Sequence, residues 1–502
     1  MGALDMKALL KKNEQRQLDL IDILYARTQA ISISEVANKL GYSERTIALD
    51  IRALQEKFPF LILKVNNQSI TMAIEPHYNI SYVYQYMFQC NTGVQLLERL
   101  FLYKQTHLKD LLTLLELSQA TVYRLIEQVN EQITHNYEVK IDTNPFQLKG
   151  DEDKIRGLFS QLYSDIYTPL EWPFINIDEA AIADLIIIVT DAIHYPLNYI
   201  GINYMKFLVA VNLVRLRQGH DVEIESEKAA YIYKTLQSTP FMSDQTKQTM
   251  KRLGVPLNQH TVNQLFHVFI NSDYIFPNSK IINFSKDIDK RIESFNHFNY
   301  IVETLKKEFD LTFDNPGPLI LNLHNAAILN HLDIDSGNIL LDSKTKFIED
   351  LSRRFPDFIS RASQLFQEYC MKMGSKWDRF LNDRLIHHLF IQWETLYTQL
   401  VKNKRIIEVI IVCNYEPNHA FFLKEYFELH FGKKVRFNIY NDSQISITQL
   451  KKVSEPIILS TFHIPFIEGK YIININFFPS EDDLEKVYNV LKKMRAMSKT
   501  IE

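Results

Sequence analysis

The chain has 502 residues, which is too long for a single hydrophobic core, so its length predicts several domains. Of these residues 46% are hydrophobic and 23% charged, a composition typical of globular domains. It carries only 13 glycines, which disfavours glycine-rich phosphate-binding loops and predicts a mainly α-helical fold. The net charge of −4 excludes a protein that is basic overall, so any DNA contact must come from a local basic surface.

The N-terminus lacks the apolar core of a signal peptide, and no apolar run reaches the about 18 residues of a membrane span. The three cysteines, Cys90, Cys370 and Cys413, form neither a CxxC pair nor a cluster at zinc spacing. We therefore expect a cytoplasmic protein that contacts no membrane and holds no metal ion or cofactor.

Residues 31–55 have the pattern of a helix-turn-helix. The inward apolar residues recur at helical spacing and are Val36, Leu40, Ile47, Ile51 and Leu54. Ala37 is small enough for a second helix to approach, Gly41 permits the turn, and Ser43 caps the second helix. A helix at 14–25 supplies a third member, and 61–64 with 69–73 predict a hairpin wing around Asn66 and Asn67.

The exposed face of the second helix in this motif predicts contact with the DNA major groove. Its candidate DNA-binding residues are Ser43, Glu44, Arg45, Thr46, Ala48, Leu49 and Arg52. Arg45 and Arg52 are the strongest candidates because guanidinium groups bind phosphates and guanine. The alternative is an ordinary helical hairpin, since alanine and glycine at a turn are common in any bundle.

Residues 107–133 repeat the theme, with alternating 137–141 and 146–149 as a second wing around Asn144 and Pro145. The candidate DNA-binding residues here are Gln119, Thr121, Tyr123 and Arg124. Leu112 stands where Ala37 stood and Glu116 where Gly41 stood, so we expect a turn that is built differently. The alternative for this second copy is a packing role without DNA contact.

From Arg405 the pattern changes to α/β. A buried strand at 405–413, a helix at 421–431 and a strand at 434–440 are followed by further strands and a closing helix at 481–494. This order predicts a small parallel sheet with flanking helices.

Two successive helix-turn-helix units, a long helical body and an α/β tail together resemble the Mga/AtxA family of Gram-positive global regulators. The resemblance implies two winged helix-turn-helix domains (1–75 and 76–170), two all-helical PTS-regulatory domains (171–286 and 287–402) and a domain at 403–502 similar to the IIB component of a sugar phosphotransferase system. It implies a DNA-binding transcription regulator that dimerises and responds to carbon source, with phosphocarrier proteins as partners.

The resemblance also implies positions for regulatory phosphorylation. Arg215 and Gly219 match the end of a helix typical of PTS-regulatory domains, but Leu208 stands where such domains commonly place a histidine. The candidate phosphorylation sites are His194, His324, His387 and His388. The alternative is that these are hydrogen-bonding histidines of the core or of a dimer surface. Adjacent His387 and His388 point in different directions on a helix and form no metal-binding pair.

In the IIB components, a nucleophilic cysteine ends the first strand and a glycine-rich loop binds the incoming phosphate. Cys413 falls at that strand end, but the following loop, 414–419, contains no glycine and includes Glu416. The sequence therefore argues against a phosphotransfer enzyme, the first alternative function. The second alternative, an RNA-binding antiterminator, begins with a short β-rich domain that the N-terminal helices here do not resemble.

Overall fold

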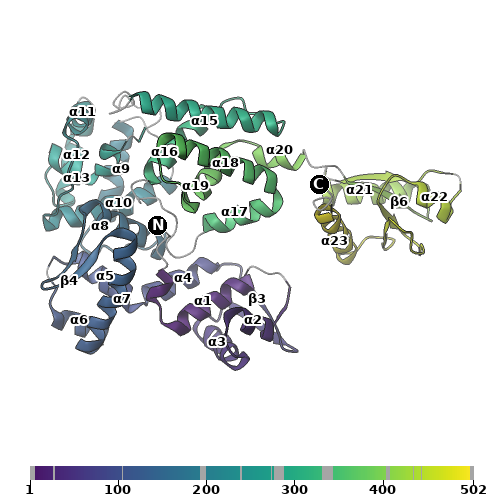
Figure 1. Ribbon diagram of the computed structural model, residues 1–502, viewed down its shortest axis with the longest axis horizontal. Coiled ribbons are helices and arrows are strands. Elements are labelled where there is room, and N and C mark those ends of the chain that lie inside the picture. The colour runs from purple at the N-terminus through teal and green to yellow at the C-terminus, as the bar shows by residue number, and fades with distance from the viewer. Residues whose placement is uncertain are drawn as a thin grey trace. The chain divides into compact units, whose positions relative to one another are not determined.

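The computed structural model describes residues 6–25, 29–104, 106–192, 199–237, 240–272, 274–275, 288–330, 343–402, 407–432, 435–442 and 444–497. They fall into two compact units (Figure 1). The first is Met1–Thr304 with Asp314–Trp393, and the second is Leu305–Phe313 with Glu394–Glu502. Helices dominate, and the parallel sheet lies in the second unit, so the predicted mainly α fold with an α/β tail is confirmed.

The first module of the first unit is a helical bundle with a small antiparallel sheet. Its elements are η1 (Met6–Leu9), α1 (Lys12–Tyr25), β1 (Ile31–Ser32), α2 (Ile33–Leu40), α3 (Glu44–Lys57), β2 (Leu61–Asn66) and β3 (Ser69–Ile74). The strand order is β1-β3-β2. Asn67 and Gln68, which join β2 to β3, have φ values of 46° and 62°, as a two-residue hairpin turn requires. The predicted winged helix-turn-helix is therefore confirmed.

Short polar caps fix where the two helices of this motif begin. The hydroxyl of Ser32 accepts a hydrogen bond from the backbone N–H of Glu35 at 3.1 Å, and that of Ser43 accepts one from Thr46 at 3.2 Å. Gly41 ends α2 in the left-handed conformation with φ 73°. The turn therefore sets the angle at which α3 leaves α2.

The second module begins with two connecting helices, α4 (Ile80–Gln89) and α5 (Thr92–Leu102), and then repeats this arrangement. Its other elements are α6 (Leu108–Leu115), α7 (Gln119–Tyr137), β4 (Lys140–Thr143) and β5 (Phe146–Lys149). β4 and β5 pair as an antiparallel hairpin around Asn144 and Pro145. The expected strand at 137–141 begins later than predicted, because Tyr137 still belongs to α7 and Glu138 ends that helix with φ 55°.

The expectation that the second turn is built differently was wrong. Glu116 adopts φ 52° and ψ 38° at the end of α6, close to the φ 73° and ψ 30° of Gly41. Ser118 then caps α7 through the backbone N–H of Thr121 at 3.3 Å, as Ser43 caps α3. The second module reaches the same backbone geometry with a non-glycine residue, which costs about 1–2 kcal/mol of local strain.

The helical body of the first unit follows the second module. Its elements are α8 (Glu152–Ile166), α9 (Glu179–Ala192), α10 (Tyr199–Gln218), α11 (Ser226–Gln237), η2 (Pro240–Met242), α12 (Asp244–Arg252), α13 (Gln259–Leu265), α14 (His267–Asn271), α15 (Ile288–Glu308), α16 (Gly317–Asn330), α17 (Ser343–Arg354), α18 (Pro356–Met373) and α19 (Arg379–Gln392). The boundary between the two units passes through α15. None of the described helices has the length and apolar composition of a membrane span.

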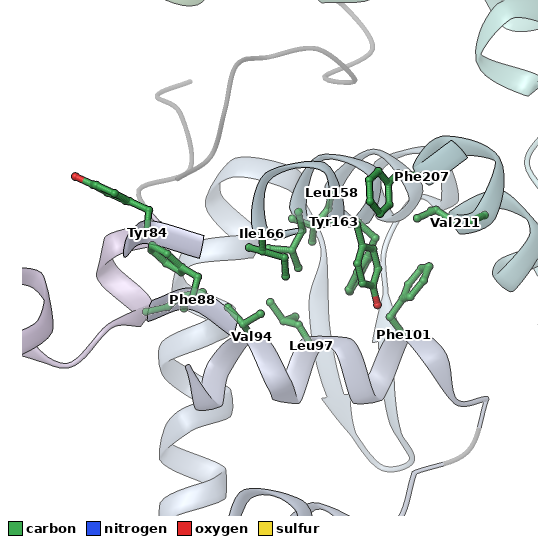
Figure 2. Packing of buried hydrophobic residues seen from close by; sticks show 14 of the residues in the cluster. Tyr84, Phe88, Val94, Leu97, Phe101, Leu158, Tyr163, Ile166, Phe207 and Val211 are labelled. Carbon is green, nitrogen blue, oxygen red and sulfur yellow. The ribbon is translucent and has the colours of Figure 1, made fainter. Parts of the chain in front are cut away.

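One apolar core joins the second module to the helical body (Figure 2). Phe101 of α5 stacks on Phe159 of α8 at a centroid distance of 4.1 Å, and Tyr163 packs beside both. Phe207 of α10 is 2% exposed in the same core. The second module and the start of the body therefore share one packed interior instead of meeting through a flexible linker.

A cluster of buried charged side chains stabilises the contact between α8 and α10. Glu152 of α8 accepts two hydrogen bonds from Arg215 of α10, at 2.9 and 2.7 Å, and one from Arg156 at 3.0 Å. Arg156, 1% exposed, also donates to the carbonyl oxygens of Gln264 and His220. Burial alone would raise the pKa of Glu152, but the hydrogen bonds and charges of Arg215 and Arg156 outweigh it and hold the pKa below its usual value.

The second unit contains α20 (Leu396–Lys402) and a four-stranded sheet. Its remaining elements are β6 (Ile407–Val412), α21 (Pro417–Phe431), β7 (Val435–Ile439), α22 (Ile447–Lys452), β8 (Ile457–Ser460), β9 (Tyr471–Asn474) and α23 (Glu481–Met497). All neighbouring strands are parallel, in the order β7-β6-β8-β9. The predicted small parallel sheet with flanking helices is confirmed.

The two turns can be compared by substitution. Gly41→Ala should destabilise the first module by about 1 kcal/mol, because the φ of 73° disfavours a Cβ although no atom lies within 4 Å of it. Glu116→Gly should stabilise the second module by a few tenths to about 1 kcal/mol, because the strain is relieved but the unfolded chain gains freedom. Urea unfolding measures both, and Gly41→Asn is the control that should cost less. Equal stabilities of wild type and Gly41→Ala would contradict the turn argument.

The Glu152 cluster predicts an acid-sensitive contact. Because the pKa of Glu152 is lowered in the folded protein, its carboxylate stabilises the fold fully at pH values above the ordinary carboxyl pKa of about 4.3. This stability is lost as the pH falls through the lowered pKa. Glu152→Gln should cost about 3–5 kcal/mol at pH 7, because it leaves two buried arginines uncompensated.

Unfolding free energies between pH 7 and pH 3 measure this, and the difference between Glu152→Gln and wild type should shrink as the wild-type carboxyl is protonated. The control is Glu35→Gln, whose ion pair with Lys39 lies at the surface, with side chains 45% and 44% exposed, and should contribute less than about 1 kcal/mol. A pH-independent difference would refute the assignment.

Candidate nucleic-acid interface

The exposed face of α3 carries the sequence-predicted residues of the first module. Glu44, Arg45 and Arg52 are exposed, Leu49 is 57% exposed, and Thr46 and Ala48 are half-buried beside them. Ser43 lies at the start of this face, where its hydroxyl is 2.8 Å from that of Thr46. All seven predicted residues therefore lie on or at the start of one helix.

The buried side of α3 is anchored by an ion pair that sequence reasoning missed. The carboxylate of Asp50, 4% exposed, accepts hydrogen bonds from Nε of Arg16 in α1 at 2.5 Å and from Nη2 of Arg16 at 3.1 Å. The hydrogen bond that Arg16 donates to Asp50 raises the pKa of Arg16, whose guanidinium also lies 4.7 Å from the ring centre of Tyr42. The available signal was a carboxylate at Asp50, three residues after buried Ile47 and so on the apolar face.

A side-chain hydrogen bond joins the wing to α3. Gln55 of α3 donates to the carbonyl oxygen of Leu63 in β2 at 2.8 Å. The far end of the hairpin exposes Lys64, Asn66 and Asn67. Lys64 was not among the predicted residues, although its place in a strand next to the turn puts a cation on the wing.

The corresponding face of α7 carries the predicted residues of the second module. Gln119, Thr121 and Arg124 are exposed, and Tyr123 is 36% exposed with its ring 6.1 Å from that of Phe146 in the wing. Counted from the capping serines, Arg124 occupies the position of Leu49 and Tyr123 that of Ala48. The two modules thus present the same scaffold with different side chains.

Arg45, Arg52 and Arg124 differ from neighbouring arginines in their surroundings. Within the described part of the chain, no hydrogen-bond or ion-pair partner engages these three guanidinium groups. By contrast, Arg16 is bound to Asp50, and Arg99 lies 3.7 Å from Asp110 and 3.7 Å from the ring centre of Tyr103. The three exposed arginines are available to an external anion such as a phosphate.

The predicted regulatory histidines lie in different environments. His324 of α16 is 2% exposed, and its Nδ1 is 2.9 Å from the hydroxyl of Ser294, which also contacts Tyr369. His387 and His388 of α19 are half-buried, and the His387 ring lies 5.6 Å from that of Phe347. His194 lies outside the described residues. Of these four histidines, only His387 and His388 both lie among the described residues and are partly accessible to solvent.

The residues matched to a PTS-regulatory helix lie in the interior. Leu208 is 2% exposed on α10. Arg215, at the end of that helix, is bound to Glu152, and Gly219 follows with φ 82°. The arginine of this helix ending therefore holds α8 and is not presented to a phosphate.

The loop after β6 and the start of α21 contact residues that follow β8 and β9. Asn414 donates from its backbone N–H to the hydroxyl of Thr461 at 3.2 Å, and that hydroxyl donates to the Asn414 side chain at 2.8 Å. The His419 ring stacks on Phe477 at 4.1 Å. Cys413 is half-buried before this loop. Among the described residues, no group of three or more His, Cys, Asp or Glu side chains could hold a metal ion.

Three family models match successive parts of the chain. The M protein trans-acting positive regulator (MGA) HTH domain matches residues 11–69, and the Mga helix-turn-helix domain matches 77–163. The M protein trans-acting positive regulator (MGA) PRD domain matches 178–396. The chain belongs to the Mga family. The resemblance inferred from the order of its parts is thereby confirmed, and this member of the Mga family is a transcription regulator with helix-turn-helix and PRD domains.

Relatives in two genera support the assignment. A putative trans-acting regulator of Streptococcus pneumoniae is 24% identical over 477 residues, covering 94% of this chain and 96% of the relative. The capsule synthesis positive regulator AcpB of Bacillus anthracis is 21% identical over 307 residues, 60% of this chain and 61% of AcpB. AcpA, a capsule synthesis positive regulator of the same organism, is 21% identical over 216 residues, 43% of this chain and 44% of AcpA.

Proposed function

We propose that this Mga-family regulator binds promoter DNA as a duplex, with α3 of the first module in the major groove. The observation that carries the proposal is the exposed α3 face with Arg45 and Arg52, neither engaged by a partner within the described chain. A major groove of about 12 Å admits a helix, and arginine binds guanine or phosphate. The wing with Lys64 lies on the same module and suits a contact with the adjacent backbone.

The other residues of the α3 face have chemically distinct tasks. Ala48 and Leu49 suit apolar contact with a thymine methyl group, Glu44 suits the amino group of cytosine, and the hydroxyls of Ser43 and Thr46 suit phosphate oxygens. In the second module, Gln119 suits adenine, and Thr121, Tyr123 and Arg124 suit the backbone. The second module therefore extends the contacted site.

We extend the proposal to regulation. Phosphocarrier proteins of the sugar phosphotransferase system would phosphorylate His387 or His388, adding up to about two negative charges beside α17 and α18.

The protein would act as a homodimer in the cytoplasm, since symmetric DNA binding doubles the contact. The strand order β7-β6-β8-β9 matches the first four strands of a doubly wound 2-1-3-4-5 sheet, which supports an IIB-like second unit. The names of AcpA and AcpB support a positive regulator.

Replacing both arginines of α3 tests the DNA proposal. Arg45→Ala with Arg52→Ala should weaken binding to a selected duplex by about tenfold or more, because each base contact contributes about 1–3 kcal/mol. Each phosphate contact that is lost should also reduce the slope of log affinity against log salt concentration by about one. Gel shifts over a salt series and genome-wide occupancy measure the effect.

The matched control replaces two exposed arginines of the helical body, Arg353 and Arg379, whose side chains are 69% and 63% exposed, by alanine. It should bind like wild type. Unchanged occupancy by the α3 variant would overturn the proposal, and preference for hairpin RNA over duplex DNA would favour an antiterminator.

The phosphorylation proposal has its own test. Incubation with labelled phosphoenolpyruvate and the general phosphotransferase proteins should label the wild type at His387 or His388, and the double alanine variant should lose the label. His77→Ala, at a side chain 72% exposed in the first module, is the control and should keep it. Stoichiometric label on Cys413 that passes to a sugar would instead identify a phosphotransfer enzyme.

A further inference from the structure

The segment immediately before α1, residues 7–10, contacts the rest of the first helix-turn-helix module and also the second module. We call it the N-terminal clamp. Its Leu9 and Leu10 are 3% and 1% exposed, so the clamp is packed into the core and not laid over the surface. Three of its successive carbonyl oxygens are held by side chains from three other elements.

Each of these carbonyls has a different donor. Gln128 of α7 donates to the carbonyl oxygen of Ala8 at 2.8 Å. Asn91, the cap of α5, donates to that of Leu9 at 3.1 Å. Gln15 of α1 donates to that of Leu10 at 2.8 Å. The clamp is therefore bound by the first module on one side and by the second on the other.

The side chain of Lys7 adds a charged link. Its ammonium lies 2.8 Å from Asp22 and 3.1 Å from Asp19, both on α1. Tyr84 of α4 donates its hydroxyl to the same Asp22 at 2.5 Å. Figure 2 shows the Tyr84 hydroxyl turned away from the apolar cluster that holds its neighbour Phe88. Burial and the Asp22 charge raise the pKa of Tyr84, which keeps this hydroxyl a donor.

These contacts connect α3 of the first module to α7 of the second. Asp50 of α3 is bound by Arg16 and lies 3.4 Å from the Gln17 amide, both on α1. α1 holds the clamp through Asp22 and Gln15, and the clamp holds α7 through Gln128. These hydrogen bonds and ion pairs, together with the backbone of α1 and of the clamp, thus link α3 to α7.

We propose that the N-terminal clamp fixes the separation and orientation of α3 and α7, so that the two modules contact one duplex only at a set spacing. Lys7 and Gln128 are its positioning residues. The inference rests on the proposed DNA binding by both modules. Two contact regions about 10 base pairs apart face the same side of the duplex, and inserting about half a turn rotates one of them to the opposite side. A fixed pair of helices cannot follow that rotation.

The experiment compares spacing dependence. The probe is a duplex selected in vitro with the wild-type protein, whose two contact regions are located by footprinting and separated by an insert of about half a helical turn. Wild type should lose about tenfold or more in affinity on insertion, because only linked, correctly placed modules gain from each other. Lys7→Met with Gln128→Leu should lose less than about threefold, because the modules can then reorient.

A duplex carrying only the first contact region checks that the variant is folded, since its affinity should equal that of wild type. Should the double variant fail this check, Gln128→Leu alone, which removes one hydrogen bond, is compared in the same spacing series. The control pair Lys12→Met and Gln248→Leu changes exposed residues and should keep the wild-type spacing dependence.

Equal spacing dependence in variant and wild type would overturn the clamp, as would a wild type that binds duplex DNA without any spacing dependence. Absence of any duplex binding by wild type would instead overturn the proposed function on which the clamp rests.

Discussion

The carboxylate of Glu152, shared by two buried arginines, is the interaction on which the first unit depends. Arg215 comes from α10 and Arg156 from α8, and Arg156 also binds carbonyl oxygens of Gln264 and His220. Since buried guanidinium groups are tolerated only when paired and hydrogen-bonded, the position of α8 and that of α10 are mutually constrained.

This constraint couples the helical body to the second helix-turn-helix module. α8 follows directly on the wing of the second module, and its Phe159 stacks on Phe101 of α5 in the core shared with α10. A shift of α10 must therefore change the surroundings of Glu152 and of the second module together. Packed interiors transmit such shifts because they are dense and have few alternative arrangements.

Local chemistry made several parts of the fold and of the interface predictable. Ser43 and Ser118 mark the starts of α3 and α7, and the spacing of Ile47, Ile51 and Leu54 leaves Arg45 and Arg52 on the opposite face. The Glu116 turn was mispredicted because a residue other than glycine can also adopt the left-handed conformation, at a local cost of about 1–2 kcal/mol, and Glu116 does so. Asp50 was overlooked because its partner Arg16 is 34 residues away.

The sequence by itself determined the order of helices and strands, the faces of the recognition helices and the family, because these follow from short-range periodicity, caps and motif order. Only the tertiary structure decided that Arg215 binds Glu152, that His324 is buried and that residues 7–10 join the two modules. Each of these depends on side chains far apart in the chain, and no local pattern encodes which distant groups will satisfy a buried charge or carbonyl.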